Sequence, residues 1–358
     1  MVRGGPRRRI TAARGQVIAQ GRSAARWFGL AAALLAALPL TARAQRFEAR
    51  SFQGLTWFKG NTHSHTTESD GDSAPEVVAQ WYRSHGYRFL VLSDHNVFTD
   101  PARLASLVDS TFLLIPGEEL TSQFDRKPVH VNGLAIPGRI EPRTDTTLVG
   151  TIQRNVDAVR EVQGVPHINH PNFRWAFGAR ELLQVRTDPL LEIFNGHPLV
   201  HNEGGDGSAG MEEIWDALLS VGKRTYGIAV DDAHHFQGEF GPDRSNPGRG
   251  WVVVAAPRLA AADLMRSLEA GSFYASSGVA LEGLEVGPET LSIRIQPQGD
   301  FKYTTTFIGD HGRVLARVGG LAPSYRLKPR DRGLRYVRAR IEDSGGARAW
   351  VQPVFLER

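Results

Sequence analysis

Two histidines separated by one residue, His63 and His65, stand at the end of a stretch with strand character, residues 57–65. Side chains of a β-strand alternate between its two faces, so residues i and i+2 point the same way. A strand here therefore predicts two imidazoles on one face, where they can bind a single metal ion. Asp70 follows after a short polar loop.

Potential ligands recur at or near the ends of further predicted strands. Residues 89–93 lead into Asp94 and His95, and the predicted strand 111–120 contains Glu118 and Glu119. Imidazole and carboxylate are ligands for Zn, Mn or Fe in hydrolases. A single His-x-His pair is weak evidence for a metal site. The recurrence of histidines and carboxylates at or near the ends of several predicted strands predicts a metal centre. The candidate metal ligands are His63, His65, Asp70, His95, Glu119, His130, His170, Asp232 and His234.

The order of the predicted elements indicates an α/β fold with a second, smaller part. Strands and helices alternate over some 220 residues, which favours parallel strands in a barrel or an open sheet with its site at the strand ends. Beyond Gly278, residues 291–295 and 337–341 alternate with period 2 between Gly/Pro turns, which predicts antiparallel strands. The predicted organisation is a signal peptide (1–44), an α/β part that carries the candidate ligands (45–280), for which the resemblance described below implies a metallohydrolase barrel, and a small C-terminal antiparallel β domain (281–358).

The first 44 residues have the composition of a secretory leader. They hold eight arginines and no acidic residue, and an apolar run over residues 27–40 ends at Ala42-Arg43-Ala44. A membrane-spanning helix needs about 20 apolar residues, so a retained anchor is the weaker interpretation. We expect a periplasmic or secreted protein with no stable membrane anchor after cleavage, exported by either the Sec or the Tat route.

Charge and cysteine content exclude other classes of function. Without the leader's eight arginines, the 42 basic and 38 acidic residues become 34 and 38, so the processed chain is acidic. Binding of nucleic acid by a basic surface is therefore excluded. The chain has no cysteine, so any metal must be held by imidazole and carboxylate.

Taken together, the motifs resemble those of the polymerase-and-histidinol-phosphatase (PHP) metal-dependent hydrolases. They occur in the family's order as Asn-Thr-His63-Ser-His65, Ser-Asp94-His95, Pro-Gly-Glu-Glu119, His130, His170-Pro171, Glu192-Ile-Phe-Asn195 and Asp232-Ala-His234. The run Gly-Ser-Phe-Tyr-Ala-Ser-Ser-Gly at 271–278 is similar to the secreted branch related to carbaryl hydrolase. The resemblance implies a distorted (β/α)7 TIM-like barrel with two to three divalent metal ions (Zn, Mn or Fe).

The resemblance also implies how the ligands divide among the ions. His63, His65, Glu119 and Asp232 would hold the first ion, and Glu119 would bridge to a second ion held with His130 and His170. Asp70, His95 and His234 would hold the third. Neighbouring strand residues face opposite ways, so one of Glu118 and Glu119 must be chosen, and the family's Gly-x-Glu pattern implies Glu119.

Such a centre predicts hydrolysis of a small-molecule substrate by a metal-bridging hydroxide. Glu119 and Asp94 are the candidate catalytic residues, Asp94 either orienting an imidazole or accepting a proton. The candidate substrate-binding residues are Asn195, His197, His235, Arg174 and Arg249. Arginine suits a phosphate because it can bind two oxygens at once.

Three functional hypotheses follow. The first is a phosphoesterase acting on a phosphate ester. The second keeps the metal site but cleaves a carboxyl ester or carbamate. The third is a non-catalytic module in which the barrel supports the β domain for binding, and degenerate ligands would mark that case.

Overall fold

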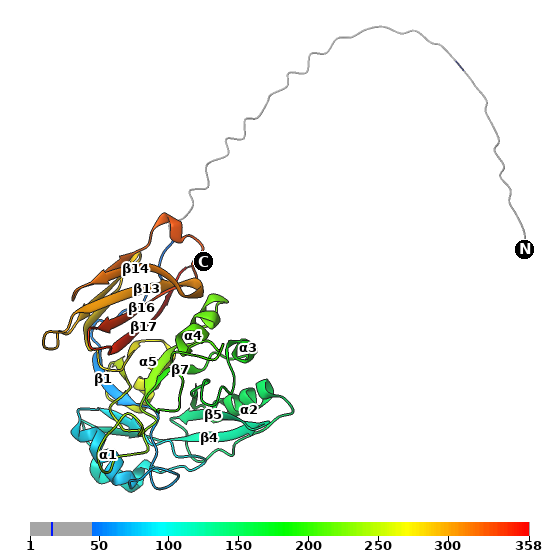
Figure 1. The fold of residues 1–358 in the computed structure, drawn as a ribbon, viewed down its shortest axis with the longest axis vertical. Coiled ribbons are helices and arrows are strands. Elements are labelled where there is room, and N and C mark those ends of the chain that lie inside the picture. The colour runs from blue at the N-terminus through cyan, green and yellow to red at the C-terminus, as the bar shows by residue number, and fades with distance from the viewer. Residues whose placement is uncertain (1–15, 17–44, 358) are drawn as a thin grey trace, which may run out of the picture. The chain divides into compact units, whose positions relative to one another are not determined.

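The computed structural model describes residues 45–357 and residue 16 (Figure 1). Apart from residue 16, the predicted signal peptide (1–44) lies outside the described residues and stays a prediction. In the described part of the chain, no helix is both long and apolar enough to cross a membrane.

The described strands form three sheets. Nine strands make the largest, in the order β14 (Arg313–Gly319), β13 (Tyr303–Gly309), β16 (Tyr336–Asp343), β17 (Arg348–Phe355), β10 (Phe273–Ser276), β9 (Trp251–Ala256), β1 (Thr56–Asn61), β2 (Phe89–Val91) and β3 (Leu113–Ile115). A second contains β4 (Gly117–Phe124), β5 (Lys127–Leu134), β6 (Val165–Ile168), β7 (Leu190–Asn195) and β8 (Gly227–Val230). The third contains β11 (Leu281–Val286), β12 (Thr290–Ile295) and β15 (Ser324–Arg326).

Helices connect and cover these strands (Figure 1). The α-helices are α1 (Pro75–Ser84), α2 (Leu148–Glu161), α3 (Ala179–Leu182), α4 (Met211–Ser220) and α5 (Ala261–Glu269). Short 3₁₀-helices occupy Pro101–Leu107, Asp310–Gly312 and Pro329–Asp331.

The predicted barrel is confirmed only as a mixed α/β arrangement. Strands β1, β2 and β3 are parallel, as are β6, β7 and β8. However, β1 pairs antiparallel with β9, and β4, β5 and β6 run antiparallel. Among the described strands, the two larger sheets meet through isolated parallel bridges, His95 with Glu119 and Ser64 with Ala233. A closed cylinder of parallel strands is therefore not seen, and the sheets join at the predicted ligands.

The predicted single strand over residues 111–120 is in fact two strands, β3 and β4, in different sheets. Pro116 lies between them and has no N–H to continue the ladder. At Gly117, a Cβ would lie 2.4 Å from Cγ1 of Val91 and 2.9 Å from the carbonyl oxygen of Gly133. The chain can therefore cross between the sheets here only because residue 117 has no side chain.

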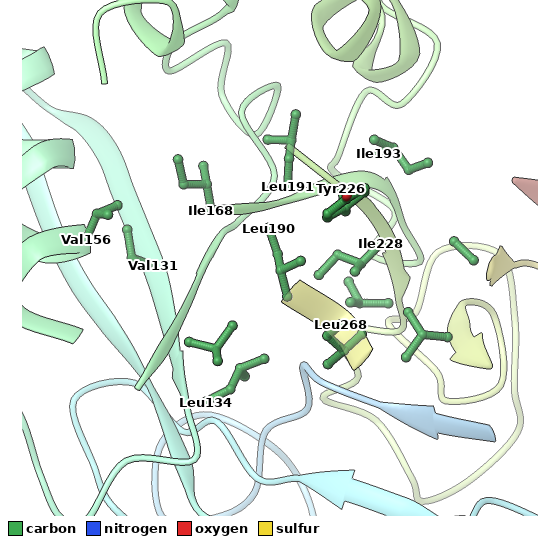
Figure 2. Close-up of a cluster of buried hydrophobic side chains, with 14 of the residues drawn as sticks. Val131, Leu134, Val156, Ile168, Leu190, Leu191, Ile193, Tyr226, Ile228 and Leu268 are labelled. Carbon is green, nitrogen blue, oxygen red and sulfur yellow. The ribbon is translucent and has the colours of Figure 1, made fainter. Parts of the chain in front are cut away.

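Helix α2 illustrates how the core behind the site forms. Oγ1 of Thr147 accepts a hydrogen bond from the N–H of Gly150 at 2.9 Å and caps the helix. Val156 and Val159 lie on its buried face. Figure 2 shows Val156 beside Val131 of β5, in a cluster that includes side chains from β6, β7, β8 and α5.

The C-terminal strands are antiparallel, as their alternation predicts, and they continue the largest sheet. Tyr274 of β10 pairs with Val351 of β17, so this sheet extends across residue 280. The predicted domain boundary at 280 stays a prediction.

A buried ion-pair network attaches the C-terminal strands to α4. Arg338 on β16 is almost fully buried. Its Nε and Nη2 each donate to Asp216 at 2.7 Å, its Nη1 donates to Glu212 at 2.7 Å, and Tyr336 donates its hydroxyl to Asp216 at 2.7 Å. The guanidinium also lies over the ring of Trp215, 4.9 Å from its centroid. Every charge is paired, which is what a buried network requires.

We expect Arg338→Met to lower the free energy of unfolding by about 3–5 kcal/mol, because Asp216 loses its bidentate partner while remaining buried. Arg340→Met is the matched control, since Arg340 is 31% exposed and makes one 3.2 Å contact with Glu212. It should cost about 1 kcal/mol or less. Urea unfolding measures both variants, and equal losses would contradict the assignment.

Candidate metal centre

The predicted strand 57–65 is shorter than expected, since β1 ends at Asn61. Ser64 nevertheless bridges Ala233, and the chain beyond β1 still brings His63 and His65 together. Both side chains are fully buried, and their Nε2 atoms lie 3.1 Å apart. Bonds of about 2.1 Å in tetrahedral geometry place ligand atoms roughly 3.4 Å apart, so these two nitrogens lie close enough to share one ion. The strand before them requires glycine, because a Cβ at Gly60 would lie 2.3 Å from the ring of Phe89 on β2.

Glu119, on β4, is the carboxylate around which the centre is arranged, and it is fully buried. Its two oxygens approach imidazole nitrogens at 2.8–3.5 Å, Oε2 those of His95, His65 and His63, and Oε1 those of His130 and His170. Each oxygen therefore faces a different group of imidazoles. A carboxylate that bridges two ions has this arrangement.

Asp232, just beyond the end of β8, completes the first predicted ligand set. Its Oδ1 lies 3.2 Å from Nε2 of His63 and 3.1 Å from Nε2 of His65. The residue adopts a left-handed backbone with φ of 48°, and His170 has φ of 21°. Such conformations are costly for non-glycine residues and concentrate at functional sites.

The third predicted set lies at the more exposed side of the centre. The side chain of Asp70 is 55% exposed, and its Oδ1 lies 3.2 Å from Nε2 of His234. Its Oδ2 lies 3.5 Å from Nε2 of His95. Nδ1 of His65 is 3.5 Å from Oδ1 of the same carboxylate, so His65 stands between the first and third sets.

The structure thus brings all nine predicted ligands together, in groups that differ in detail from the implied sets. Ligand atoms within 4.8 Å of one another form four groups: His63, His65 and Glu119; His63, His170 and Asp232; His95, Glu119 and His130; and His65, Asp70, His95 and His234. His170 therefore lies closer to the first set than the resemblance implies.

Two buried atoms of the centre have no hydrogen-bond partner among the described residues. They are Oε2 of Glu119 and Nδ1 of His130. Each lies within 2.9 Å of a polar atom, the first near His95 and the second near Glu119, but the directions do not suit a hydrogen bond. Buried polar atoms without partners are rare and call for an explanation such as an ion. A bound cation would supply the missing partner for both Oε2 of Glu119 and Nδ1 of His130.

The pKa values of the buried carboxylates and imidazoles favour binding of a cation in the centre. Burial raises the pKa of Glu119, but the imidazoles of His95 and His130 outweigh it and hold that pKa well below its ordinary value. Burial lowers the pKa of His95, yet Glu119 and Asp70 raise it to about 11. Burial, with His234 nearby, lowers the pKa of His65 to about 3. A cation that displaces the His95 proton therefore meets ionised carboxylates and a neutral imidazole.

A carboxylate absent from the predicted site residues, Glu192 on β7, supports the ligands. It is fully buried. Its Oε1 lies 2.7 Å from Nδ1 of His63 and 3.1 Å from Nε2 of His167, and its Oε2 accepts from the backbone N–H of His170 at 2.7 Å. Such partners orient ligand imidazoles. Its place in the motif with Asn195 was the signal that could have identified it.

Asn169 is a second residue that the sequence did not single out. Its Nδ2 donates to Oε1 of Glu119 at 2.7 Å and to Oδ1 of Asn132 at 2.8 Å. It therefore fixes the orientation of the central carboxylate.

Asp94 makes its hydrogen bonds to the loop that follows His65. It is fully buried, and its carboxylate accepts hydrogen bonds from Thr66 (N–H at 2.7 Å, hydroxyl at 2.9 Å) and from the hydroxyl of Ser69 at 2.7 Å. These bonds hold the loop that carries Asp70. In the structure, Asp94 therefore positions this loop and is linked to an imidazole through Ser69, whose hydroxyl oxygen lies 3.4 Å from Nδ1 of His65.

Two of the predicted substrate-binding residues are committed to internal contacts. Nδ2 of Asn195 donates to Glu192 at 2.9 Å and to Asp232 at 3.1 Å. The guanidinium of Arg249 donates to the carbonyl oxygens of Gly196, at 2.9 Å, and Gly241. Both residues therefore build the site instead of facing a substrate.

The other three lie at the rim. The ring of His197 is 5.5 Å from that of His234, and the ring of His235 is 6.4 Å from it. Arg174 is exposed, with its guanidinium 5.3 Å from the ring centroid of Phe173. Phe173 in turn packs on His170, with ring centroids 5.2 Å apart. His197 and His235 thus lie beside the ligand His234, and Phe173 lies beside the ligand His170.

No protein-family model matches the chain, and no curated protein matches it. Among solved structures it is similar to a two-domain protein from Bacteroides vulgatus that contains a predicted PHP-like metal-dependent phosphoesterase. The identity is 16% and the TM-score 0.48, over 87% of this chain and 99% of that one.

Two further solved structures cover less of the chain. One is a proposed metal-dependent phosphoesterase from Bifidobacterium adolescentis, 14% identical with a TM-score of 0.39, over 58% of this chain and 94% of that one. The other is an amidohydrolase from Chromobacterium violaceum with bound sulfate and no metal, 13% identical with a TM-score of 0.36, over 52% and 93%. The first of these similar structures contains a PHP-like protein, the family that the motifs resemble, and activity and substrate rest on the geometry of the site.

We expect Glu192→Gln to weaken divalent-metal affinity by roughly 10- to 100-fold, because the amide can no longer accept hydrogen bonds at both positions, from His63 and from the backbone N–H of His170. Competition with a chromogenic chelator measures the affinity. Glu269→Gln, which removes a surface carboxylate paired with Arg160, is the control and should leave it unchanged. Equal affinities in the two folded variants would contradict the supporting role.

Proposed function

We propose that this chain is an exported, PHP-type metal-dependent hydrolase and that it acts on phosphate esters. One observation carries the proposal: nine imidazoles and carboxylates from distant parts of the chain converge into groups whose ligand atoms lie within 4.8 Å of one another. Similar clusters of acids occur without metal on exposed surfaces, but here most of the side chains are buried. Burial of so many ionisable groups is costly unless they serve a cation.

The residues present suit two or three divalent ions. The donors are imidazole nitrogens and carboxylate oxygens without thiolate, a set that suits Zn, Mn or Fe. Glu119 and Asp232 would serve the inner ions with His63, His65, His130 and His170, and Asp70 with His95 and His234 would serve the outer one. When bound, such ions supply Lewis acidity and lower the pKa of coordinated water.

The chain's own residues orient the reactants and exclude water. Glu192 and Asn169 fix the ligands, and the buried floor keeps bulk solvent away. Nδ1 of His197 accepts a hydrogen bond from the N–H of Leu199 at 3.2 Å, and burial lowers the pKa of this imidazole. The neutral ring therefore carries its proton on Nε2, from which it can donate to a substrate oxygen.

The rim favours a phosphate ester over the alternatives. Arg174 makes no side-chain hydrogen bond or ion pair within the described residues, and its guanidinium lies over Phe173, which packs on His170. A guanidinium binds phosphate oxygens in pairs. The apolar ring of Phe173 is the feature that favours the second candidate, a carboxyl ester or carbamate. Degenerate ligands would have favoured a non-catalytic module, and none of the nine ligands is missing.

Export to the periplasm or the medium is part of the proposal. It rests on the basic, acid-free residues 1–44, with their apolar run and their Ala42-Arg43-Ala44 end. Loss of this segment on purification from the periplasmic fraction would support it.

Elemental analysis of the purified protein should find two or more Zn, Mn or Fe ions per chain. Hydrolysis of aryl phosphates should be lost in His63→Ala, because Nε2 of His63 lies close to the carboxylates of both Glu119 and Asp232. His85→Ala is the control, since His85 stacks on Trp81 on the outside of α1. A panel of aryl phosphates, aryl esters and carbamates completes the assay, and metal-loaded protein active only on carboxyl esters would favour the second candidate.

Arg174→Ala should raise KM for phosphate monoesters by about tenfold, because a charge-assisted contact of roughly 1.4 kcal/mol is lost. Neutral esters should be unaffected. Arg180→Ala removes another exposed arginine, in α3 a few residues away, and should change neither KM. Steady-state kinetics on both substrates decide the point, and parallel rises in KM would argue against phosphate recognition by Arg174.

A further inference from the structure

A groove of about 570 Å³ lies between the segment before β1 and strand β11. This volume falls within the roughly 300–1,000 Å³ of small-molecule sites. Trp57 lines it at the start of β1, whereas His63 follows the end of the same strand. Six residues of extended chain span about 20 Å, so the groove is separate from the metal centre.

One wall of the groove is aromatic. Phe52 and Trp57 are stacked, with ring centroids 5.3 Å apart and planes at 24°. Trp57 also contacts Tyr274, with ring centroids 5.7 Å apart, which holds the indole in place. Both lining rings are partly exposed, and the indole N–H of Trp57 has no protein acceptor within the described chain. Flat apolar rings beside a free polar donor suit a ligand that is apolar on one face and polar at its edge.

The opposite wall is polar and planar. Arg294 is more than half exposed, and its Nη1 lies 3.1 Å from Oε1 of Glu285. A Cβ at Gly283 would lie 2.4 Å from Nη2 of Arg294, so the guanidinium lies directly over this glycine. Glu282 adds an exposed carboxylate. These groups supply several donors and acceptors side by side. Because the carboxylates balance the arginines, a neutral ligand fits best.

The groove is poorly suited to a peptide strand or a lipid. Strand β11 is at the edge of its sheet, but its register shifts at a bulge between Leu281 and Gly283. Arg50 already bridges Val286 at the other end. Bulges and blocked edges oppose strand addition. A lipid chain would leave the charged wall without partners.

We propose that this groove binds a neutral saccharide, with one sugar ring stacked on the Phe52–Trp57 wall and its hydroxyls hydrogen-bonded to Arg294 and Glu282. Vicinal hydroxyls match the paired donors of a guanidinium and the paired acceptors of a carboxylate. The site is independent of the hydrolytic function proposed above. It would hold the protein on a glycan while the metal centre stays open.

Isothermal titration calorimetry with maltotriose, cellotriose and chitotriose tests the proposal on the processed full-length protein. At least one trisaccharide should bind with millimolar affinity. Trp57→Ala should weaken it about tenfold and Arg294→Ala about fivefold, through loss of the stacking surface and of hydrogen bonds. Hydrolytic activity should stay unchanged in both variants, because neither residue belongs to the metal centre.

Matched controls separate recognition from folding. Phe301→Ala removes another exposed aromatic ring, and Arg326→Ala removes an exposed arginine paired with Glu289. Both should keep the wild-type affinity. The proposal is overturned if no trisaccharide binds, if Trp57→Ala and Arg294→Ala bind as the wild type does, or if an extended peptide occupies the groove and the sugars do not. Arg294→Ala remains informative if Trp57→Ala fails to fold, since Arg294 lies on the surface.

Discussion

A buried carboxylate is stable only beside positive charge or enough hydrogen-bond donors, and this constraint organises the molecule. Glu119, Asp232 and Glu192 are all buried in one centre. Imidazoles surround the first two, and the third anchors His63, His167 and the backbone of His170. The chain leaves one sheet at Pro116 and enters another at Gly117, and this places Glu119 between the imidazoles of both. Only cations bound among these groups can balance the ligand set with its imidazoles neutral.

Local rules predicted much of the centre. The spacing of His63 and His65 predicted that they share an ion, although both lie beyond the end of β1. Recurrence of imidazoles and carboxylates at or near predicted strand ends identified the nine ligands that the structure brings together, even though His130 lies within β5. The antiparallel C-terminal strands also followed from their period. The pairing of strands and the division into sheets could not be predicted in this way, because they depend on contacts between residues that are distant in the sequence. No local pattern distinguishes a single strand at 111–120 from two strands split at Pro116, or shows that β1 pairs with β9.

Residue type and proximity did not determine what each side chain contacts. Asp94 precedes the ligand His95, yet its carboxylate is turned to Thr66 and Ser69. Arg249 has donors that could bind a phosphate, but they donate to backbone carbonyl oxygens instead. Glu192 was visible as part of a motif, but its role depends on His63 and His167, which lie elsewhere in the chain. Orientation is set by packing, which sequence spacing does not encode.

The C-terminal strands take part in positioning the centre as well as closing the fold. Trp350 of β17 packs on Phe194 of β7, with ring centroids 5.6 Å apart, two residues from Glu192. Gln352 of β17 exchanges two hydrogen bonds with the backbone of Gly227, at 2.8 and 2.7 Å, at the start of β8. Strand β7 carries the anchor of His63, and β8 leads to Asp232. Since a shift of about 1 Å in a ligand or its support is enough to impair such a site, the strands beyond residue 280 are as much a part of the metal centre's geometry as the strands that bear its ligands.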